Sequence, residues 1–144
     1  MSDATFTHWL TIPLYDTDAA GRLFFGHLFR HAHDAFESFM AMLGLPLDQL
    51  IRDGQILLPL IHAEADYHQP LCHGDVVQVQ VMVLELRRRS FAMGYRFLNE
   101  RGERAASART VHVQVSADGT ADVELAASLR AALTACLASQ QQTG

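Results

Sequence analysis

The stretch of sequence that decides the fold is Tyr15-Asp16-Thr17-Asp18-Ala19-Ala20-Gly21-Arg22-Leu23-Phe24-Phe25-Gly26-His27. It immediately precedes a pattern in which apolar residues recur at steps of three and four positions as far as Leu43, which is typical of one face of an α-helix. Gly44, followed by Leu45-Pro46, marks the end of that helix. The sequence therefore predicts a glycine-containing loop that leads directly into one long amphipathic helix.

This loop has the composition of an active-site segment. A loop that brings a carboxylate to a helix N-terminus places an anionic group beside backbone N–H donors that have no partner within the helix. A carbonyl carbon bound there is open to attack while its oxygen is polarised by the N–H groups and the helix dipole. Gly21 lets such a loop turn sharply or approach a substrate closely.

Beyond the helix, the period of the hydrophobic pattern changes to two residues, which is the period of a β-strand. Apolar and polar side chains alternate in Ile61–His68, so we expect a half-buried strand there, and Val76–Leu86 is long and rich in β-branched residues. The other predicted elements are a first strand over 6–14, a short helix over 47–52, strands over 91–98 and 104–116, a closing helix over 124–138 and a frayed end over 140–144. One long helix followed by four consecutive strands predicts an α+β fold, in which an antiparallel sheet wraps around the helix.

The composition is that of an acidic globular protein. Its 144 residues predict a single domain over 1–144, and a hydrophobic content of 49% argues against disorder. The net charge of −5 gives no general attraction to nucleic acid, and no apolar run is long enough to span a membrane. There is no signal-peptide pattern, and Cys72 and Cys136 form neither a disulfide framework nor a zinc signature, so we expect a cytoplasmic protein with reduced thiols.

The motif Asp16-Thr17-Asp18-Ala19-Ala20-Gly21 resembles the D-x-D-x-x-G signature of the 4-hydroxybenzoyl-CoA thioesterase family. Further similarities follow in the same order along the chain, in His33–Glu37 of the helix and in the basic turn Arg87–Phe91. Residues 59–63 and 69–75 resemble the P-I-x-H-A and R-P-L-x-x-G-D segments of the branch that acts on 1,4-dihydroxy-2-naphthoyl-CoA. The resemblance covers residues 6 to 116 and implies the hotdog fold.

The resemblance also implies an activity. The expected enzyme hydrolyses the thioester of an acyl-CoA, with an aromatic acyl group favoured, to a free acid and coenzyme A. It is expected to form a homodimer, commonly paired into a homotetramer, with its sites at the protomer interface. Water and a carboxylate suffice for the reaction, and the helix histidines lack the H-E-x-x-H spacing, so we expect no cofactor and no metal. The alternative is a hotdog protein that binds an acyl-CoA or acyl-carrier-protein thioester without hydrolysing it, and the retained aspartate argues against this.

Asp18 aligns with the catalytic aspartate of the family. Because a thiolate leaves readily, a carboxylate either attacks the carbonyl directly to form a mixed anhydride or deprotonates a water, and the sequence leaves both routes open. The non-catalytic interpretation is that Asp18 caps the following helix. Asp16 is either the second member of a catalytic pair or a loop residue that binds N–H groups in an Asx turn, and we favour the loop role.

The remaining candidate residues surround this aspartate in the expected fold. Phe25 aligns with the position whose backbone N–H polarises the thioester carbonyl, and Gly26 is a secondary backbone donor. Phe24 is a candidate substrate contact, a role compatible with aromatic core packing. His62 is either an acyl-pocket residue or an ordinary histidine on a sheet face, and Glu37 either faces the substrate or makes a surface pair on the helix.

Arg87, Arg88 and Arg89 form the basic cluster of an otherwise acidic chain. The matching segment of the family contacts the nucleotide of coenzyme A, whose phosphates an arginine fork binds through two hydrogen bonds. The alternative is a solvated hairpin turn, in which arginine is unremarkable. No basic groove with interleaved aromatic residues accompanies the cluster, so it does not predict nucleic-acid binding.

Overall fold

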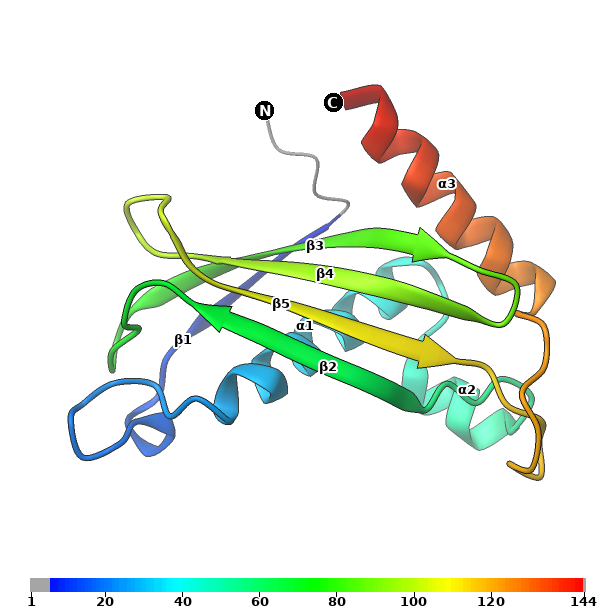
Figure 1. Ribbon diagram of the computed structural model, residues 1–144, viewed down its shortest axis with the longest axis horizontal. Coiled ribbons are helices and arrows are strands. Elements are labelled where there is room, and N and C mark those ends of the chain that lie inside the picture. Colours follow the sequence, from blue (N-terminus) through cyan, green and yellow to red (C-terminus); the bar gives the residue numbers. More distant parts are fainter. Residues whose placement is uncertain (1–5, 144) are drawn as a thin grey trace.

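The computed structural model describes residues 6–143, in which a five-stranded antiparallel sheet curves around one long helix (Figure 1). The predicted α+β class is thereby confirmed. In chain order the elements are β1 (Phe6–Thr11), the 3₁₀ turn η1 (Leu14–Asp16), α1 (His27–Met42), α2 (Leu47–Asp53), β2 (Leu60–Tyr67), β3 (Val76–Leu86), β4 (Ser90–Leu98), β5 (Arg104–Val113) and α3 (Ala127–Thr143).

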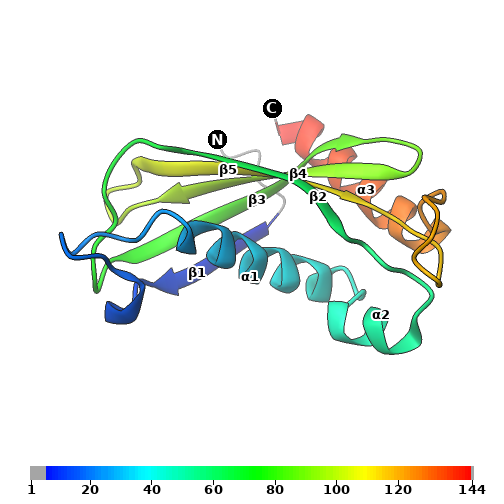
Figure 2. The same ribbon diagram turned by 60° about the horizontal axis from the view of Figure 1, so that its bottom comes forward.

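The strands lie side by side in the order β1-β3-β4-β5-β2, and every neighbouring pair is antiparallel. The short turns between β3, β4 and β5 make these three strands the centre of the sheet. The strands that flank the helices in the sequence, β1 and β2, form its two edges. Figure 2 shows α1 and α2 together on one side of the sheet, which is called the inner face below.

The core lies between α1 and this inner face. Alternation along β3 places four valines on it, and all of them are buried: Val77, Val79, Val81 and Val83. They pack in one cluster with Leu28, Phe36 and Phe39 of α1. Burial of each such side chain contributes roughly 1.5–3 kcal/mol, so this packing holds the whole helix, including its first turn, in a fixed position on the sheet.

Strand β1 is shorter than the predicted strand over 6–14. It ends at Thr11, and Leu14–Asp16 forms a 3₁₀ turn instead. Pro13 explains the early end, because proline has no N–H to donate to a strand ladder. This turn delivers Asp16 toward the first turns of α1.

Helix α3 differs from the predicted helix over 124–138 at both ends. It begins at Ala127, and the two residues before it donate their N–H groups outside the helix, Leu125 to the Arg88 carbonyl and Ala126 to Gln114 Oε1. It continues to Thr143, past the predicted end at position 138, and Gly144 lies outside the described residues. None of the helices described, α3 included, is long and apolar enough to cross a membrane.

The side chain of Gln140 joins the last turns of α3 to strand β3. Its amide accepts a hydrogen bond from Val83 N–H at 2.9 Å and donates one to the Val83 carbonyl at 2.8 Å. Among the described residues, β1 pairs with β3 as far as Val81, and Gln140 bonds to the β3 backbone just beyond that point.

Strand β2 is far more exposed than the half-buried strand that the alternation predicts. The alternation itself is present, since Ala63, Ala65 and Tyr67 lie on the inner face and His62 and Glu64 on the outer face. The strand is exposed because it forms the edge of the sheet and α1 packs over β1 and β3 instead. The result is an unpaired edge with apolar side chains, which is a surface suited to association.

Candidate active site

Asp16 connects the loop between η1 and α1 to helix α1 through side-chain hydrogen bonds. Its buried carboxylate accepts hydrogen bonds from the guanidinium of Arg30 and from His31 Nε2, the latter at 2.7 Å. Burial alone raises the pKa of Asp16, but the hydrogen bonds from His31 and Arg30 outweigh it and hold this pKa below its usual value. The Asp16 carbonyl also accepts a hydrogen bond from Phe24 N–H at 2.9 Å. Asp16 therefore has the structural role in the loop that the sequence analysis favoured. It fulfils this role through an ion pair, so the prediction of an Asx turn at Asp16 is wrong.

Asp18 makes the Asx turn instead. Its Oδ1 accepts hydrogen bonds from the backbone N–H groups of Ala20 at 2.9 Å and Arg22 at 3.2 Å, and within the described residues Oδ2 accepts none. The interpretation of Asp18 as a helix cap is wrong, because α1 begins at His27 after Gly26 without a side-chain cap. The turn orients the carboxylate and leaves one of its oxygens open to a ligand.

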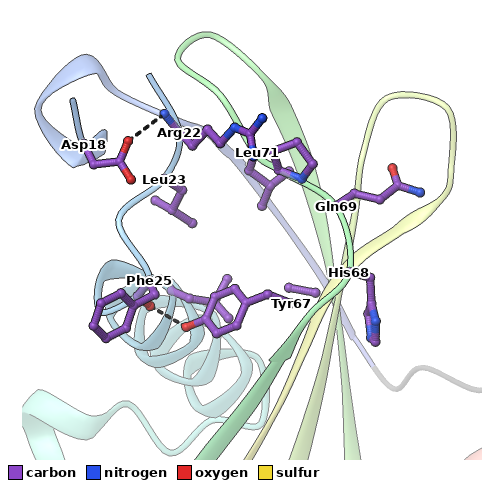
Figure 3. Close-up of a pocket in the computed structure, with 11 residues that line it drawn as sticks. Asp18, Arg22, Leu23, Phe25, Tyr67, His68, Gln69 and Leu71 are labelled. Carbon is purple, nitrogen blue, oxygen red and sulfur yellow. Dashed lines mark hydrogen bonds between the residues drawn. The ribbon is translucent and has the colours of Figure 1, made fainter. Parts of the chain in front are cut away.

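A cavity of about 340 Å³ opens between this loop, the start of α1 and the end of β2, and it is called cavity 1 below (Figure 3). Its wall consists of Asp18, Arg22, Leu23, Phe25, Leu28, Tyr67, His68, Gln69, Pro70, Leu71 and Ala106. Figure 3 shows Asp18 and Arg22 at the loop end of this space and Phe25 and Tyr67 at the helix end. The structure therefore brings two predicted site residues, Asp18 and Phe25, to one cavity.

The backbone N–H groups of Phe25 and Gly26 are open to a ligand. The Phe24 carbonyl accepts a hydrogen bond from His27 N–H at 2.9 Å, and the Phe25 carbonyl accepts one from the hydroxyl of Tyr67. In a trans peptide the C=O and the following N–H point in opposite directions, so the two N–H groups point away from these partners. Neither of them donates a hydrogen bond within the described part of the chain.

Phe24 lies beside cavity 1 rather than in its wall. Its ring is 42% exposed and packs on the ring of Phe25 with centroids 4.6 Å apart, and on that of His27 with centroids 5.5 Å apart. A contact between Phe24 and substrate therefore requires a ligand that extends beyond this cavity.

Glu37 lines a second cavity, of about 300 Å³, which is called cavity 2 below. Its wall consists of His33, Phe36, Glu37, Leu47, Asp48, Leu50, Ile51, Ile56, Leu57, Leu58, Leu60 and His112. Burial lowers the pKa of His112 to about 4, and its neutral ring stacks on Phe36 with centroids 4.4 Å apart. Position 37 is ten residues beyond the start of α1 at position 27, about 15 Å along the axis, so Glu37 is remote from Asp18 within one chain.

His62 lines neither cavity. It lies on the outer face of β2, half exposed, and its Nε2 is 3.6 Å from the Glu64 carboxylate. Among the residues that the structure describes, no three His, Cys, Asp or Glu side chains are arranged to hold a metal ion.

Arg87, Arg88 and Arg89 form the turn between β3 and β4, at the end of the sheet opposite the first turn of α1 (Figure 1). Arg87 Nε lies 3.1 Å from a Glu85 carboxylate oxygen, and an Arg88 nitrogen lies 2.6 Å from one of Glu124. Within one chain the turn is not brought to cavity 1.

The comparison with known families agrees with this architecture. The sequence profile of the thioesterase-like superfamily matches residues 12–133. The chain belongs to this superfamily. It is 37% identical over 114 residues to the 1,4-dihydroxy-2-naphthoyl-CoA hydrolase of Synechococcus elongatus, which covers 78% of this chain and 82% of that protein. The enzyme of the same name from Rippkaea orientalis is 33% identical over 108 residues, which covers 74% of this chain and 78% of that one.

Solved structures of the superfamily superpose closely on this one. A 1,4-dihydroxy-2-naphthoyl-CoA thioesterase from Synechocystis has a TM-score of 0.84 at 28% identity, covering 90% of this chain and 95% of its own. A gentisyl-coenzyme A thioesterase has a TM-score of 0.81 at 26% identity, covering 90% and 99%. These similarities confirm the predicted hotdog fold and the prediction that the chain is a thioester hydrolase.

Most of the wall of cavity 1 was not predicted from the sequence, including Arg22, Tyr67 and Gln69. Arg22 and Gln69 stand in segments that resemble the family, so for these two the signal was present, whereas Tyr67 lies between two such segments. Arg22 belongs to the loop, Tyr67 is the last residue of β2, and Gln69 follows it two positions later. Their importance depends on how the loop and the end of β2 approach each other, which periodicity does not reveal.

Proposed function

We propose that the protein hydrolyses an aromatic acyl-CoA to the free acid and coenzyme A, with Asp18 as the carboxylate that starts the reaction. The observation that carries this proposal is that Asp18 lies in one cavity with the start of α1, where the N–H groups of Phe25 and Gly26 have no partner among the described residues. The names of the relatives support an aromatic acyl group. We place the reaction in the cytoplasm, because both cysteines are free thiols.

In this proposal the thioester carbonyl oxygen accepts hydrogen bonds from the N–H groups of Phe25 and Gly26. Removing one such donor typically costs about 2.7–4 kcal/mol of transition-state stabilisation, and the helix dipole favours the same developing charge. Asp18 Oδ2 then follows one of two routes. It attacks the carbonyl carbon, which expels the thiolate and leaves a mixed anhydride for water to cleave, or it takes a proton from a water that attacks instead.

We also propose a homodimer that pairs through the β2 edge and assembles into a homotetramer. Leu60 and Ile61 of this edge are 52% and 59% exposed, and its outer backbone groups have no partner strand among the described elements. A two-fold axis makes the paired β2 strands antiparallel, so the start of the partner's β2 lies beside the end of this one. Cavity 2 of the partner then adjoins cavity 1 of this chain, which brings Glu37 to the acyl group across the interface.

The same two-fold symmetry determines which residues contact the phosphates of coenzyme A in this proposal. It places the partner's β3–β4 turn at the end of the dimer where cavity 1 opens, so Arg87, Arg88 and Arg89 contact the phosphates in trans. His62, on the outer face of β2, contributes less than Glu37 in this arrangement.

The test is the release of thiol, followed with a chromogenic disulfide reagent, from aroyl-CoA and straight-chain acyl-CoA esters. Asp18→Asn retains an oxygen that can accept the hydrogen bonds of the Asx turn, so we expect an unchanged fold and KM with kcat reduced about a hundred-fold or more. Asp53→Asn, at the exposed end of α2, is the matched control and keeps wild-type kcat.

Near-wild-type kcat in Asp18→Asn would remove Asp18 from the mechanism. Tight binding of acyl-CoA esters without thiol release by either protein would instead favour the alternative, a hotdog protein that binds thioesters without cleaving them. The Asp18 oxygen in cavity 1 that accepts no hydrogen bond from the described residues is the feature that such a binding protein leaves unexplained.

A further inference from the structure

Arg22 places a positive charge in the wall of cavity 1, beside Asp18. Within the described part of the chain its guanidinium contacts no carboxylate, although those of Arg30, Arg87 and Arg88 each contact one. A guanidinium remains protonated at every physiological pH and presents only donors. An ion pair with the residues that the structure describes therefore does not account for this side chain.

The backbone of Arg22 is held firmly on two sides. Its carbonyl accepts a hydrogen bond from Asp18 N–H at 2.8 Å, and its N–H donates to Asp18 Oδ1 at 3.2 Å. On the other side it bridges to Cys72, and the N–H of Leu23 donates to the Leu71 carbonyl at 2.6 Å. The side chain consequently starts from a fixed point between Asp18 and Leu71, which Figure 3 shows at the loop end of the cavity.

This position determines which part of a substrate Arg22 can reach. Asp18 must approach the thioester carbonyl carbon, and the backbone of Arg22 is hydrogen-bonded directly to the Asp18 carboxylate. The guanidinium therefore lies within one side-chain length of the reacting group. The phosphates of coenzyme A are separated from the sulfur by the long pantetheine arm, so an oxygen of the acyl group is within easier reach.

We propose that Arg22 binds an anionic oxygen of the acyl group, a carboxylate or a phenolate, and thereby selects acidic aromatic acyl groups over neutral ones. This inference rests on the proposed thioesterase function and adds the chemistry by which it discriminates. The arginine fork matches the two oxygens of a carboxylate, and a charge-assisted hydrogen bond of this kind changes affinity about ten- to a hundred-fold.

The test compares Arg22→Gln with the wild-type protein on benzoyl-CoA and on benzoyl-CoA esters that carry a carboxylate or, at a pH at which it is ionised, a hydroxyl group. We expect the KM for the substituted esters to rise about ten-fold or more, and the KM for benzoyl-CoA to change less than about two-fold. Arg52→Gln is the control, because Arg52 is an exposed arginine of α2 paired with Asp48. An equal change in KM for every ester would overturn the proposal.

Thioesters of N-acetylcysteamine distinguish the two possible sources of the anion, because they carry the acyl group without phosphates. The effect of Arg22→Gln persists with them if the anion is on the acyl group, and its disappearance would assign the contact to a phosphate and overturn the proposal. Calorimetric binding of benzoate and phthalate keeps the test independent of turnover. If the wild-type protein hydrolyses no ester, the proposed function fails. Equal binding of phthalate by the wild-type protein and Arg22→Gln would overturn the role of Arg22, whether or not the protein hydrolyses an ester.

Discussion

Two aspartates that stand two positions apart in the loop have opposite environments. Asp16 is 1% exposed and paired with Arg30 and His31, whereas Asp18 is exposed and lines cavity 1. A buried carboxylate that accepts two charged hydrogen bonds is a poor nucleophile, because attack requires it to give them up. One aspartate is therefore suited to anchor the loop and the other to react, and burial rather than spacing separates the two roles.

Replacing the anchor should weaken the fold and the site together. In Asp16→Asn the side chains of Arg30 and His31 lose their carboxylate partner, so we expect the free energy of unfolding in urea to fall by about 2 kcal/mol. We expect kcat to fall as well, because the loop that carries Asp18 is less firmly held. The control Asp53→Asn, an exposed site, should change stability by less than about 0.5 kcal/mol. Equal stability of the two variants would contradict the anchoring role.

The lowered pKa of Asp16 also predicts how this contribution depends on pH. A carboxylate whose pKa is lower in the folded state stabilises the protein fully above the unfolded pKa, about 3.9, and loses this effect as the pH falls through the folded value. The stability difference between wild type and Asp16→Asn should therefore be constant from pH 7 to about pH 5 and shrink below about pH 4. A difference that already shrinks between pH 8 and 6 would contradict the assignment of the effect to the Asp16 carboxylate.

At the scale of elements, hydrophobic periodicity predicted every helix and strand of the sheet, because α1 and the central strands bury one regular face each. It failed where single polar contacts decide the outcome. Gln140 extends α3 through two hydrogen bonds to Val83, and nothing in the helical pattern indicates that partner. Likewise, the loop and Phe25 were predicted as site components, but Tyr67, whose hydroxyl binds the Phe25 carbonyl across 42 positions, was not.

The contact between β2 and α1 through Tyr67 is expected to position the donors of the active site. Because the Phe25–Gly26 peptide is planar, the hydrogen bond to its carbonyl orients the Gly26 N–H. Burial raises the pKa of Tyr67, so the hydroxyl keeps its proton and donates at neutral pH. We expect Tyr67→Phe to lower kcat about ten-fold with little change in KM, since the loss affects a transition-state contact.

Steady-state thiol release measures this split between kcat and KM. The control Tyr15→Phe removes the hydroxyl of a tyrosine that is 80% exposed and outside cavity 1, and it should behave as wild type. Sedimentation of both variants checks that the β2 edge still associates normally. A rise in KM at constant kcat would indicate that Tyr67 contacts the substrate in the ground state instead.

At the scale of the whole molecule, the predicted site residues divide into two groups at opposite ends of the sheet. Asp18 and Phe25 lie in cavity 1, while Glu37 lies in cavity 2 and Arg87, Arg88 and Arg89 form the distant β3–β4 turn. The exposed β2 edge lies between the two ends, and in the proposed homodimer antiparallel pairing of two such edges joins one group of each chain to the other group of its partner. A single sequence carries no signal of which group acts within the chain and which acts across the interface.

Mixed dimers test whether the site is shared in this way. The double variant Arg87→Ala/Arg89→Ala should raise KM for acyl-CoA with little loss of kcat, and Asp18→Asn should abolish turnover. In a dimer of one subunit of each kind, one site combines both defects. The other site joins an intact Asp18 to an intact arginine turn, so unfolding and refolding a mixture of the two variants should restore wild-type KM at part of the wild-type rate. If Asp18 and the turn act within one chain, the mixture shows only the raised KM of the arginine variant. Recovery of the low KM therefore requires that each chain supply the carboxylate for one site and the phosphate contacts for the other.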